Sequence, residues 1–249
     1  PGPIPQAAVM GPVHILNQLG DAAADISVAG DALPHFAPLP RDFYLPSAEE
    51  VAPRLLGHWL VRKTPAGWCG GLIVETEAYL ADDPACHGAP GPTARNRVMF
   101  GPPGFAYVYL IYGCHFCVNA VCQPEHTAEA VLIRAVTPDF GIPQMRRRRP
   151  GHDLDRLTNG PGKLCRAMAI DRKLDGADLC DPSSPLLIAA NPEAEKVVAT
   201  LGPVRVSSRI GISRAVTLPL RFYLDQSRHV SNRRLGRRRA AGQRPGVGL

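Results

Sequence analysis

The sequence lacks the features of a membrane or secreted protein. No apolar run approaches the ~20 residues that a helix needs to span a bilayer. The start of the chain lacks a basic region followed by an apolar one, so we expect no secretory signal. The seven cysteines are an odd number scattered through apolar segments, which indicates reduced thiols in an intracellular protein rather than a disulfide framework. The sequence also contains no internal repeats.

What is present is a large apolar fraction and an excess of positive charge. Hydrophobic residues make up 45% of the 249 residues, enough to bury a core in one domain with extensions. The formal net charge is +6, and arginine supplies most of the positive charge. Arginine side chains suit phosphates, so composition allows a polyanionic partner. A basic protein without such a partner remains an equal alternative.

Composition also divides the chain into three parts. Residues 1–39 are rich in proline, glycine and alanine, and we expect a flexible extension with at most a short helix at 13–25. Residues 40–225 form the folded domain. Residues 226–249 carry seven arginines and no acid, which predicts a basic, disordered tail.

The first half of the domain predicts a helix and two strands. Ser47-Ala48-Glu49-Glu50 has the spacing of a capping box, and Gly57 can end the helix that it opens. Pro53 is unfavourable inside a helix and moves the expected start toward Val51. Two strands are then expected at 58–63 and 68–79, joined by a turn.

A hairpin follows a long loop at 80–100. Two β-prone runs meet at Tyr112-Gly113, which predicts a hairpin over 105–121 with Tyr112 near its tip. A tyrosine at that place is either a lone exposed side chain or a wedge. The remaining expected elements are strands at 130–136, 204–212 and 218–224 and helices at 138–145 and 159–170.

The start of the last of these helices suggests an anion site. Asn159 is a possible cap, Pro161 lies in the first turn, and Lys163 follows two residues later. Free backbone N–H groups beside a lysine can bind a phosphate. An ordinary capped helix is the simpler interpretation of the same residues.

The strand at 68–79 provides the strongest indication of a site. Side chains alternate in a strand, so Glu75, Glu77 and Tyr79 share one face of a hydrophobic segment. Carboxylates on such a face are costly to bury, and we interpret this face as the floor of a site. Tyr107 and Tyr109 share a face of another strand by the same parity.

At this point several motifs together resemble one family. They are Val74-Glu75-Thr76-Glu77-Ala78-Tyr79, Arg95-Asn96-Arg97 before Met99-Phe100, Tyr107-Val108-Tyr109-Leu110-Ile111-Tyr112-Gly113 and Gly160-Pro161-Gly162-Lys163-Leu164-Cys165. In this order and spacing, over roughly residues 40–223, they are similar to the alkyladenine (3-methyladenine) DNA glycosylases. The resemblance implies a mixed α/β (α+β) fold, a single domain around a curved antiparallel β-sheet with flanking helices.

The resemblance also implies an activity. Such enzymes flip alkylated or deaminated purines out of duplex DNA and hydrolyse the N-glycosidic bond, leaving an abasic site. They use one step, no metal and no cofactor, and do not cut the strand. The implied partner is double-stranded DNA containing damaged bases, with no membrane. We expect a monomer inside the cell, in the cytoplasm or nucleoid, or in the nucleus of a eukaryote.

Roles for single residues follow from the matching positions. The catalytic groups are Glu77 as the base that activates water, with Arg134 and the carbonyl of Ile210 holding that water. Tyr79, His87 and Tyr109 would hold the extruded base, and the bulk of Asn119 would disfavour normal guanine. The residues expected to contact DNA are Tyr112, as the wedge in the vacated stack, Met99, Arg95 and Lys163.

Three other interpretations remain open. Glu75 and Glu77 are near the lower limit of separation for the two carboxyls of a sugar hydrolase, although Glu75 is more simply a structural partner of an arginine. Cys114-His115-Phe116-Cys117 contains possible zinc ligands, but no second pair follows. The same fold without catalysis would be a nucleic-acid binding module.

Overall fold

The computed structural model describes residues 36–231, whereas residues 1–35 and 232–249 lie outside the described part. The short helix expected at 13–25, most of the expected extension and the arginines after residue 231 therefore fall outside it. The described chain divides between Ala37 and Pro38, and the elements below all belong to the unit that begins at Pro38.

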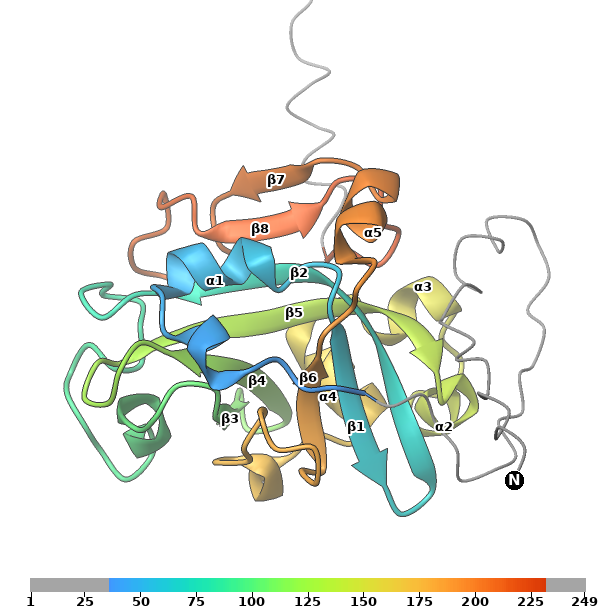
Figure 1. The fold of residues 1–249 in the computed structure, drawn as a ribbon, viewed down its shortest axis with the longest axis horizontal. Helices are drawn as coiled ribbons and strands as arrows, with labels where there is room; N and C mark the ends of the chain where they lie inside the picture. Colours follow the sequence, from blue (N-terminus) through green and yellow to red (C-terminus); the bar gives the residue numbers. More distant parts are fainter. Residues whose placement is uncertain (1–35, 232–249) are drawn as a thin grey trace, which may run out of the picture. The chain divides into compact units, whose positions relative to one another are not determined.

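The unit is built on one antiparallel sheet. Its strands follow the order β3-β4-β5-β2-β1-β6, while β8 pairs with β2 and β7 with β8. The strands are β1 (Trp59–Thr64), β2 (Gly67–Tyr79), β3 (Ala106–Ile111), β4 (His115–Cys122), β5 (Glu129–Phe140), β6 (Leu186–Ala189), β7 (Val204–Ser207) and β8 (Arg221–Leu224). The long strands β2 and β5 lie side by side through the middle of the sheet (Figure 1).

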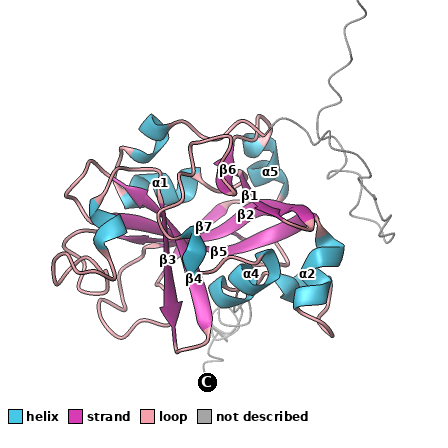
Figure 2. Ribbon diagram, turned by 90° about the horizontal axis from the view of Figure 1, so that it is seen from below, coloured by secondary structure: helices cyan, strands magenta, loops and turns pink. Residues whose placement is uncertain are grey.

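Short helices flank this curved sheet, as Figure 2 shows. They are α1 (Ala48–Arg54), α2 (Ile142–Arg148), α3 (Leu154–Leu157), α4 (Pro161–Met168) and α5 (Ala194–Thr200), with 3-10 turns η2 (Arg41–Tyr44), η3 (Arg97–Phe100) and η4 (Arg172–Leu174). Helices α2 and α4 contact one another, and α4 packs on β4 and β5. The expected α+β fold around a curved antiparallel sheet is confirmed. No helix within residues 36–231 has the length and apolar character required to traverse a bilayer.

Strand β2 changes partners along one edge, and this change positions the site. Its first part pairs with β1, with Trp59 opposite Leu72, whereas Glu75 and Glu77 lie opposite Tyr223 and Arg221 of β8. The ladder to β5 shifts register on both sides of Glu75. Such bulges bend a strand and redirect its side chains. Both glutamates therefore lie where three strands meet.

A pair of glycines allows β2 to approach its neighbours closely. A Cβ atom on Gly71 would lie 2.1 Å from the carbonyl oxygen of Thr137, and one on Gly70 would lie 2.4 Å from the ring of Phe140. Real Cβ atoms do not approach other atoms this closely, so any other residue here would push β2 away from β5.

The expected helix boundaries were partly wrong. Ser47 caps the helix as expected, because its hydroxyl accepts a hydrogen bond from the Glu50 N–H (3.3 Å) and lies 3.1 Å from the Glu50 carboxylate. Helix α1 nevertheless begins at Ala48 and ends at Arg54, so that Pro53 lies in its last turn. The helix expected from residue 138 begins only at Ile142, because β5 continues to Phe140. Pro138 lies beside a register shift opposite Gly71, a position where a strand tolerates a missing N–H.

The C-terminal boundary also differs from expectation. Strands β7 and β8 are shorter than the segments 204–212 and 218–224. The tail was expected to begin at residue 226, but Ser227, His229, Val230 and Ser231 are buried. The packed part of the chain therefore extends to Ser231.

Candidate active site

Glu77 forms the floor of the candidate site and is completely buried, with 0% of its surface exposed. One carboxylate oxygen, Oε1, accepts a hydrogen bond from the backbone N–H of Ile210 (2.8 Å). The other, Oε2, accepts from the Tyr79 hydroxyl and from Nη1 of Arg134, each at 3.0 Å. The same Nη1 lies 3.5 Å from the carbonyl oxygen of Ile210. The three residues predicted to be catalytic therefore meet at one point.

Glu75 is held more completely than Glu77. Its Oε1 accepts from Nε of Arg134 (3.1 Å), from Nε of Arg221 (2.6 Å) and from the Ser231 hydroxyl (2.7 Å). Its Oε2 accepts from the Ser231 N–H (2.6 Å). The interpretation of Glu75 as a structural partner is confirmed. A buried carboxylate with four donors cannot serve as the acid of a sugar hydrolase, so that alternative is not supported.

The charges of this floor are balanced within the chain. Burial raises the pKa of Glu77, while Arg134, the Ile210 N–H and the Tyr79 hydroxyl each lower it. Burial lowers the pKa of Arg134, but the negative charges of Glu77 and Glu75 together raise it by more, so the pKa is higher than that of an exposed arginine. Arg134 therefore stays positively charged, and Glu77 is more basic than an exposed glutamate.

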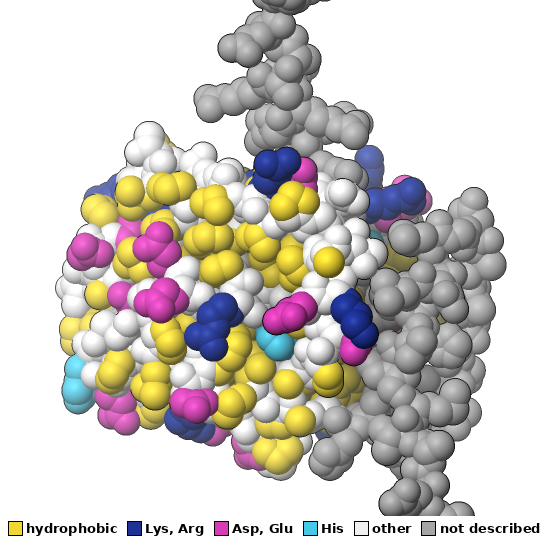
Figure 3. Space-filling view, turned by 45° about the horizontal axis from the view of Figure 1, so that its top comes forward, with side chains coloured by type: hydrophobic (Ala, Val, Ile, Leu, Met, Phe, Trp, Pro, Cys, Tyr) yellow, Lys and Arg dark blue, Asp and Glu magenta, His cyan; other side chains and the backbone are white. Residues whose placement is uncertain are grey.

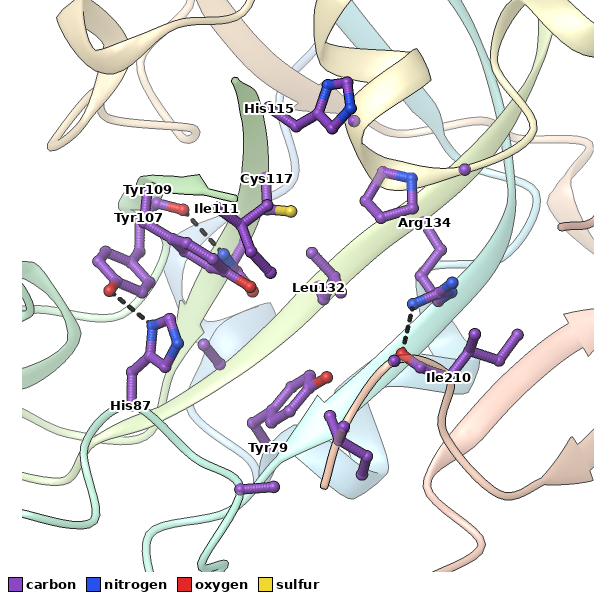
Figure 4. A pocket seen from close by; sticks show the side chains of 18 of the residues that line it. Tyr79, His87, Tyr107, Tyr109, Ile111, His115, Cys117, Leu132, Arg134 and Ile210 are labelled. Carbon is purple, nitrogen blue, oxygen red and sulfur yellow. Dashed lines mark hydrogen bonds between the residues drawn. The ribbon is translucent and has the colours of Figure 1, made fainter. Parts of the chain in front are cut away.

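A pocket of about 410 Å³ opens above this floor. Its lining includes an aromatic and imidazole set consisting of Tyr79, His87, Tyr107, Tyr109, Tyr112 and His115. Arg134 and Ile210 also line it, whereas Glu77 lies behind them and does not. Figure 4 shows the rings of His87, Tyr107 and Tyr109 grouped on one side of the pocket, Arg134 with Ile210 on the other, and Tyr79 between them. The pocket thus offers ring faces to a planar ligand, next to the two residues that donate hydrogen bonds to the buried Glu77.

The imidazole of His87 belongs to this aromatic group. Its Nδ1 lies 2.9 Å from the Tyr107 hydroxyl, and its ring centre lies 4.4 Å from that of Tyr109. Burial, and then Arg95, lower the pKa of His87, so the ring is neutral at pH 7. A neutral ring can stack on a cationic base without repelling it.

The loop before η3 fixes His87 through Asn96, a residue of the Arg95-Asn96-Arg97 motif for which no role was predicted. The Asn96 amide donates to the carbonyl oxygens of His87 (2.7 Å) and Gly91 (3.0 Å). Its oxygen accepts from the Thr93 N–H (2.6 Å). Asn96 is buried. A single asparagine between two arginines was the only signal in the sequence.

Tyr79 is held from behind by a second buried ion pair. The guanidinium of Arg209 lies 4.6 Å from the centre of the Tyr79 ring. Arg209 forms a buried ion pair with Asp83 and donates to the carbonyl oxygen of Ala78 (3.0 Å). No local pattern connects these two residues, because 126 positions separate Arg209 from Asp83.

Asn119 and Cys117 line the pocket wall from β4. The Asn119 amide donates to the carbonyl oxygen of Tyr107 (2.9 Å), which fixes the side chain in orientation. Burial raises the pKa of Cys117 to about 11, so its thiol is uncharged. Cys114 is exposed, and within residues 36–231 no group of three or more potential metal ligands comes together.

The predicted DNA-contacting residues lie in different environments. Tyr112 is 78% exposed at the tip of the β3–β4 hairpin, with a left-handed backbone (φ 53°). Arg95 donates to the carbonyl oxygen of Leu110 (3.1 Å), and its guanidinium lies 6.0 Å from the centre of the Tyr109 ring. Lys163 donates to the Asn159 side chain (2.8 Å).

Met99 lies elsewhere than expected. It is 2% exposed and packs in the hydrophobic cluster beneath the aromatic rings, where it lines the pocket. Because η3 turns Met99 inward, its side chain belongs to the pocket wall and not to the outer surface expected of a DNA contact.

Comparison with known proteins gives consistent matches over this unit. A model of the family described as "Methylpurine-DNA glycosylase (MPG)" matches residues 42–228. Three similar proteins are each named "Putative 3-methyladenine DNA glycosylase". That of Rhodopseudomonas palustris is 48% identical over 193 residues, 78% of this chain and 87% of that protein. That of Methanoculleus marisnigri is 47% identical over 198 residues, 78% and 99% of the two chains. That of Agrobacterium fabrum is 46% identical over 199 residues, 80% and 95% of the two chains.

Proposed function

The chain belongs to the methylpurine-DNA glycosylase family, and we propose that it acts on a purine that has left the duplex and entered the pocket of Tyr79, His87 and Tyr109. It is a DNA repair glycosylase, a hydrolase of N-glycosyl bonds that processes alkylated bases. The observation that carries the proposed mechanism is the meeting of Glu77, Arg134 and Ile210 at the floor of an aromatic pocket.

Stacking in the pocket offsets the cost of extruding the base. Flipping a nucleotide costs a few kcal/mol, and less when the base is damaged or mispaired. Stacking on an aromatic side chain contributes about 1–3 kcal/mol per base. A 3- or 7-alkylated purine is cationic, so it gains further from the ring faces of Tyr79 and Tyr109. Asn119, fixed beside the rings, is the residue that we propose disfavours normal, unmodified guanine.

Glu77 is the general base of the proposed step. It accepts a proton from a water molecule held by Arg134 and the carbonyl of Ile210. The water oxygen bonds to the anomeric carbon of the sugar, the bond from that carbon to the purine nitrogen breaks, and its electron pair leaves with the base. The raised pKa of Glu77 makes it a better proton acceptor than an exposed glutamate. Because Glu77 lies behind Arg134 and Ile210, the water must approach between these two residues.

The residues around the mouth of the pocket would hold the duplex. Tyr112 protrudes from the hairpin and is suited to fill the place of the extruded base. Arg95 and Lys163 are suited to contact phosphates. The proposed excision step needs only one chain and one duplex. We therefore propose a monomer that acts on damaged double-stranded DNA inside the cell.

Product analysis tests this function. The wild-type protein, incubated with a duplex containing one hypoxanthine or ethenoadenine, should release the free base and leave an intact strand that breaks only after alkali treatment. The same duplex without the lesion is the control. If the protein released no base from any duplex of a panel with different lesions, the function would be refuted. Strand cleavage before alkali would refute the monofunctional mechanism.

A further inference from the structure

A second pocket, about 350 Å³ in volume, adjoins the base pocket. Its lining consists of His115, Arg149, Pro150, His152, Gly162, Lys163 and Arg166. We call it the basic pocket, because its titratable side chains are arginine, lysine and histidine and none is a carboxylate. His115, Gly162 and Lys163 line both pockets, so whatever binds in the basic pocket lies next to whatever binds in the base pocket.

Arg149 is the unusual member of this lining. It is 8% exposed, and its buried Nε has no hydrogen-bond partner. Within residues 36–231 its guanidinium makes no ion pair. The neighbouring Arg148 is different, because it donates to the carbonyl oxygen of Ala167 (3.0 Å) and to the Gln144 side chain (3.3 Å). A buried charge without a counter-charge is unfavourable, so Arg149 has the properties of a group whose partner is a ligand.

The neighbours of Arg149 increase the local positive charge instead of neutralising it. Burial, and then Arg166, lower the pKa of Arg149. Burial, followed by Arg149 and Arg156, lowers that of Lys163. These groups repel one another, and an anion among them would relieve the repulsion. On the face drawn in Figure 3, in contrast, acidic and basic side chains lie among each other.

The start of α4 adds to this field. Gly162 and Lys163 lie in its first turn, where backbone N–H groups point out of the helix and favour negative charge. A Cβ on Gly162 would lie 3.0 Å from Cβ and Cγ of His115, so the glycine lets the His115 side chain pack closely against the first turn of α4 between the two pockets.

We propose that the basic pocket binds a backbone phosphate of the DNA, adjacent to the nucleotide in the base pocket, with Arg149 as the principal ligand and Lys163 and Arg166 beside it. The proposal rests on the proposed function, because the ligand is the same duplex. It adds an anchor that fixes the strand beside the reacting sugar, in which Arg149 and Arg166, so far without a role, join Lys163.

The salt dependence of binding to an undamaged duplex tests the proposal, since no excision is involved. Each phosphate contact contributes about 0.9 to the slope of log affinity against log salt concentration. Arg149→Met keeps most of the buried stem and removes the charge, so the slope should become shallower by about 0.9. Arg149→Lys should retain most of the slope. The matched control is Arg205→Met. Arg205 lies on β7 and carries the same charge, but it is already paired with Asp225, so its removal should leave the slope unchanged.

The outcomes separate the phosphate site from the enzyme activity. If Arg149→Met and Arg205→Met give the same slope as the wild type, the phosphate site is refuted. If Arg149→Met has the shallower slope but the wild type releases no damaged base, the site stands and the proposed function fails. With both correct, the wild type releases the damaged base and Arg149→Met has the shallower slope, while a cooperative urea unfolding transition shows that the variant is folded.

Discussion

The floor of the base pocket and the basic pocket each contain a buried arginine, and the two arginines differ in their partners. Arg134, 5% exposed, donates to Glu75 and Glu77. Arg149, 8% exposed, has no hydrogen bond or ion pair from its guanidinium within the described residues. One charge is neutralised by the chain itself, whereas the other is left for a partner from outside.

This difference separates a group used for chemistry from a group used for binding. A catalytic constellation must hold its geometry before the substrate arrives, and paired charges with several hydrogen bonds provide that. A binding group gains affinity when its charge is satisfied only in the complex. The comparison predicts that substitutions in the floor will affect rate and stability, and that those at the mouth will affect affinity.

The largest expected effect comes from Glu77→Gln, which keeps the shape of the side chain but cannot accept a proton. Excision of ethenoadenine in a single turnover, with enzyme in excess, should slow by about 10²–10⁴-fold, while affinity for the damaged duplex is retained. Glu129→Gln is the control, since Glu129 is also buried but accepts a hydrogen bond from the Ala48 N–H, whereas Glu77 accepts from Arg134 and Ile210, which line the pocket. A Glu77→Gln rate within threefold of the wild type would remove Glu77 from the chemistry.

The two arginines provide the next test. Arg134→Met leaves two buried carboxylates without their shared partner and should cost about 3–5 kcal/mol in the free energy of unfolding. Arg149→Met removes a charge with no partner and should cost little or increase stability. Urea unfolding of both variants measures the difference. Equal losses would contradict the distinction between the floor and the basic pocket.

Tyr112→Ser should weaken binding of a damaged duplex by about 1–3 kcal/mol, the contribution of one stacked base. The side chain is exposed, so the free energy of unfolding should not change. Val206→Ser, which changes another exposed apolar residue, on β7, is the control. Unchanged affinity in Tyr112→Ser would refute its assignment as the wedge.

The last prediction concerns a single hydrogen bond of the floor, which Ser231→Ala removes. It removes the hydroxyl that donates to Glu75 but leaves the Ser231 N–H bond in place. Because the lost bond is to a charged group, the unfolding free energy should fall by about 1.5 kcal/mol. Ser227→Ala, which loses only a bond from the His229 N–H, should cost less. A larger cost for Ser227→Ala would mean that Ser231 does not support Glu75.

The sequence predicted the parts of the site that depend on local periodicity. Alternation along one strand placed Glu77 and Tyr79 on one face, and the glycine after Tyr112 marked the hairpin tip. Their partners were not predictable, because they come from distant positions. Ser231 is 156 residues from Glu75, and it lies beyond the residues that match the family.

The burial of Arg149 could not be predicted from the sequence either. Arg149 is the last of four consecutive arginines, and composition cannot distinguish between them. In the structure Arg146 and Arg147 are exposed, whereas Arg149 follows the end of α2 and is turned inward. The burial of a side chain at a helix end depends on the packing of α2 against α4, which no local pattern encodes.

The central claim is that ionised Glu77 takes the proton from the attacking water, and the pH dependence of excision tests it most directly. A 7-methylguanine duplex suits this measurement, because that base is already cationic and needs no proton to leave. Since burial raises the pKa of Glu77, the single-turnover rate should rise with pH through a pKa above the ordinary value for glutamate of about 4.3, and then level off. Glu77→Gln should give a slow rate without this rise. A rise that persists in Glu77→Gln, or a flat profile in the wild type, would contradict the account.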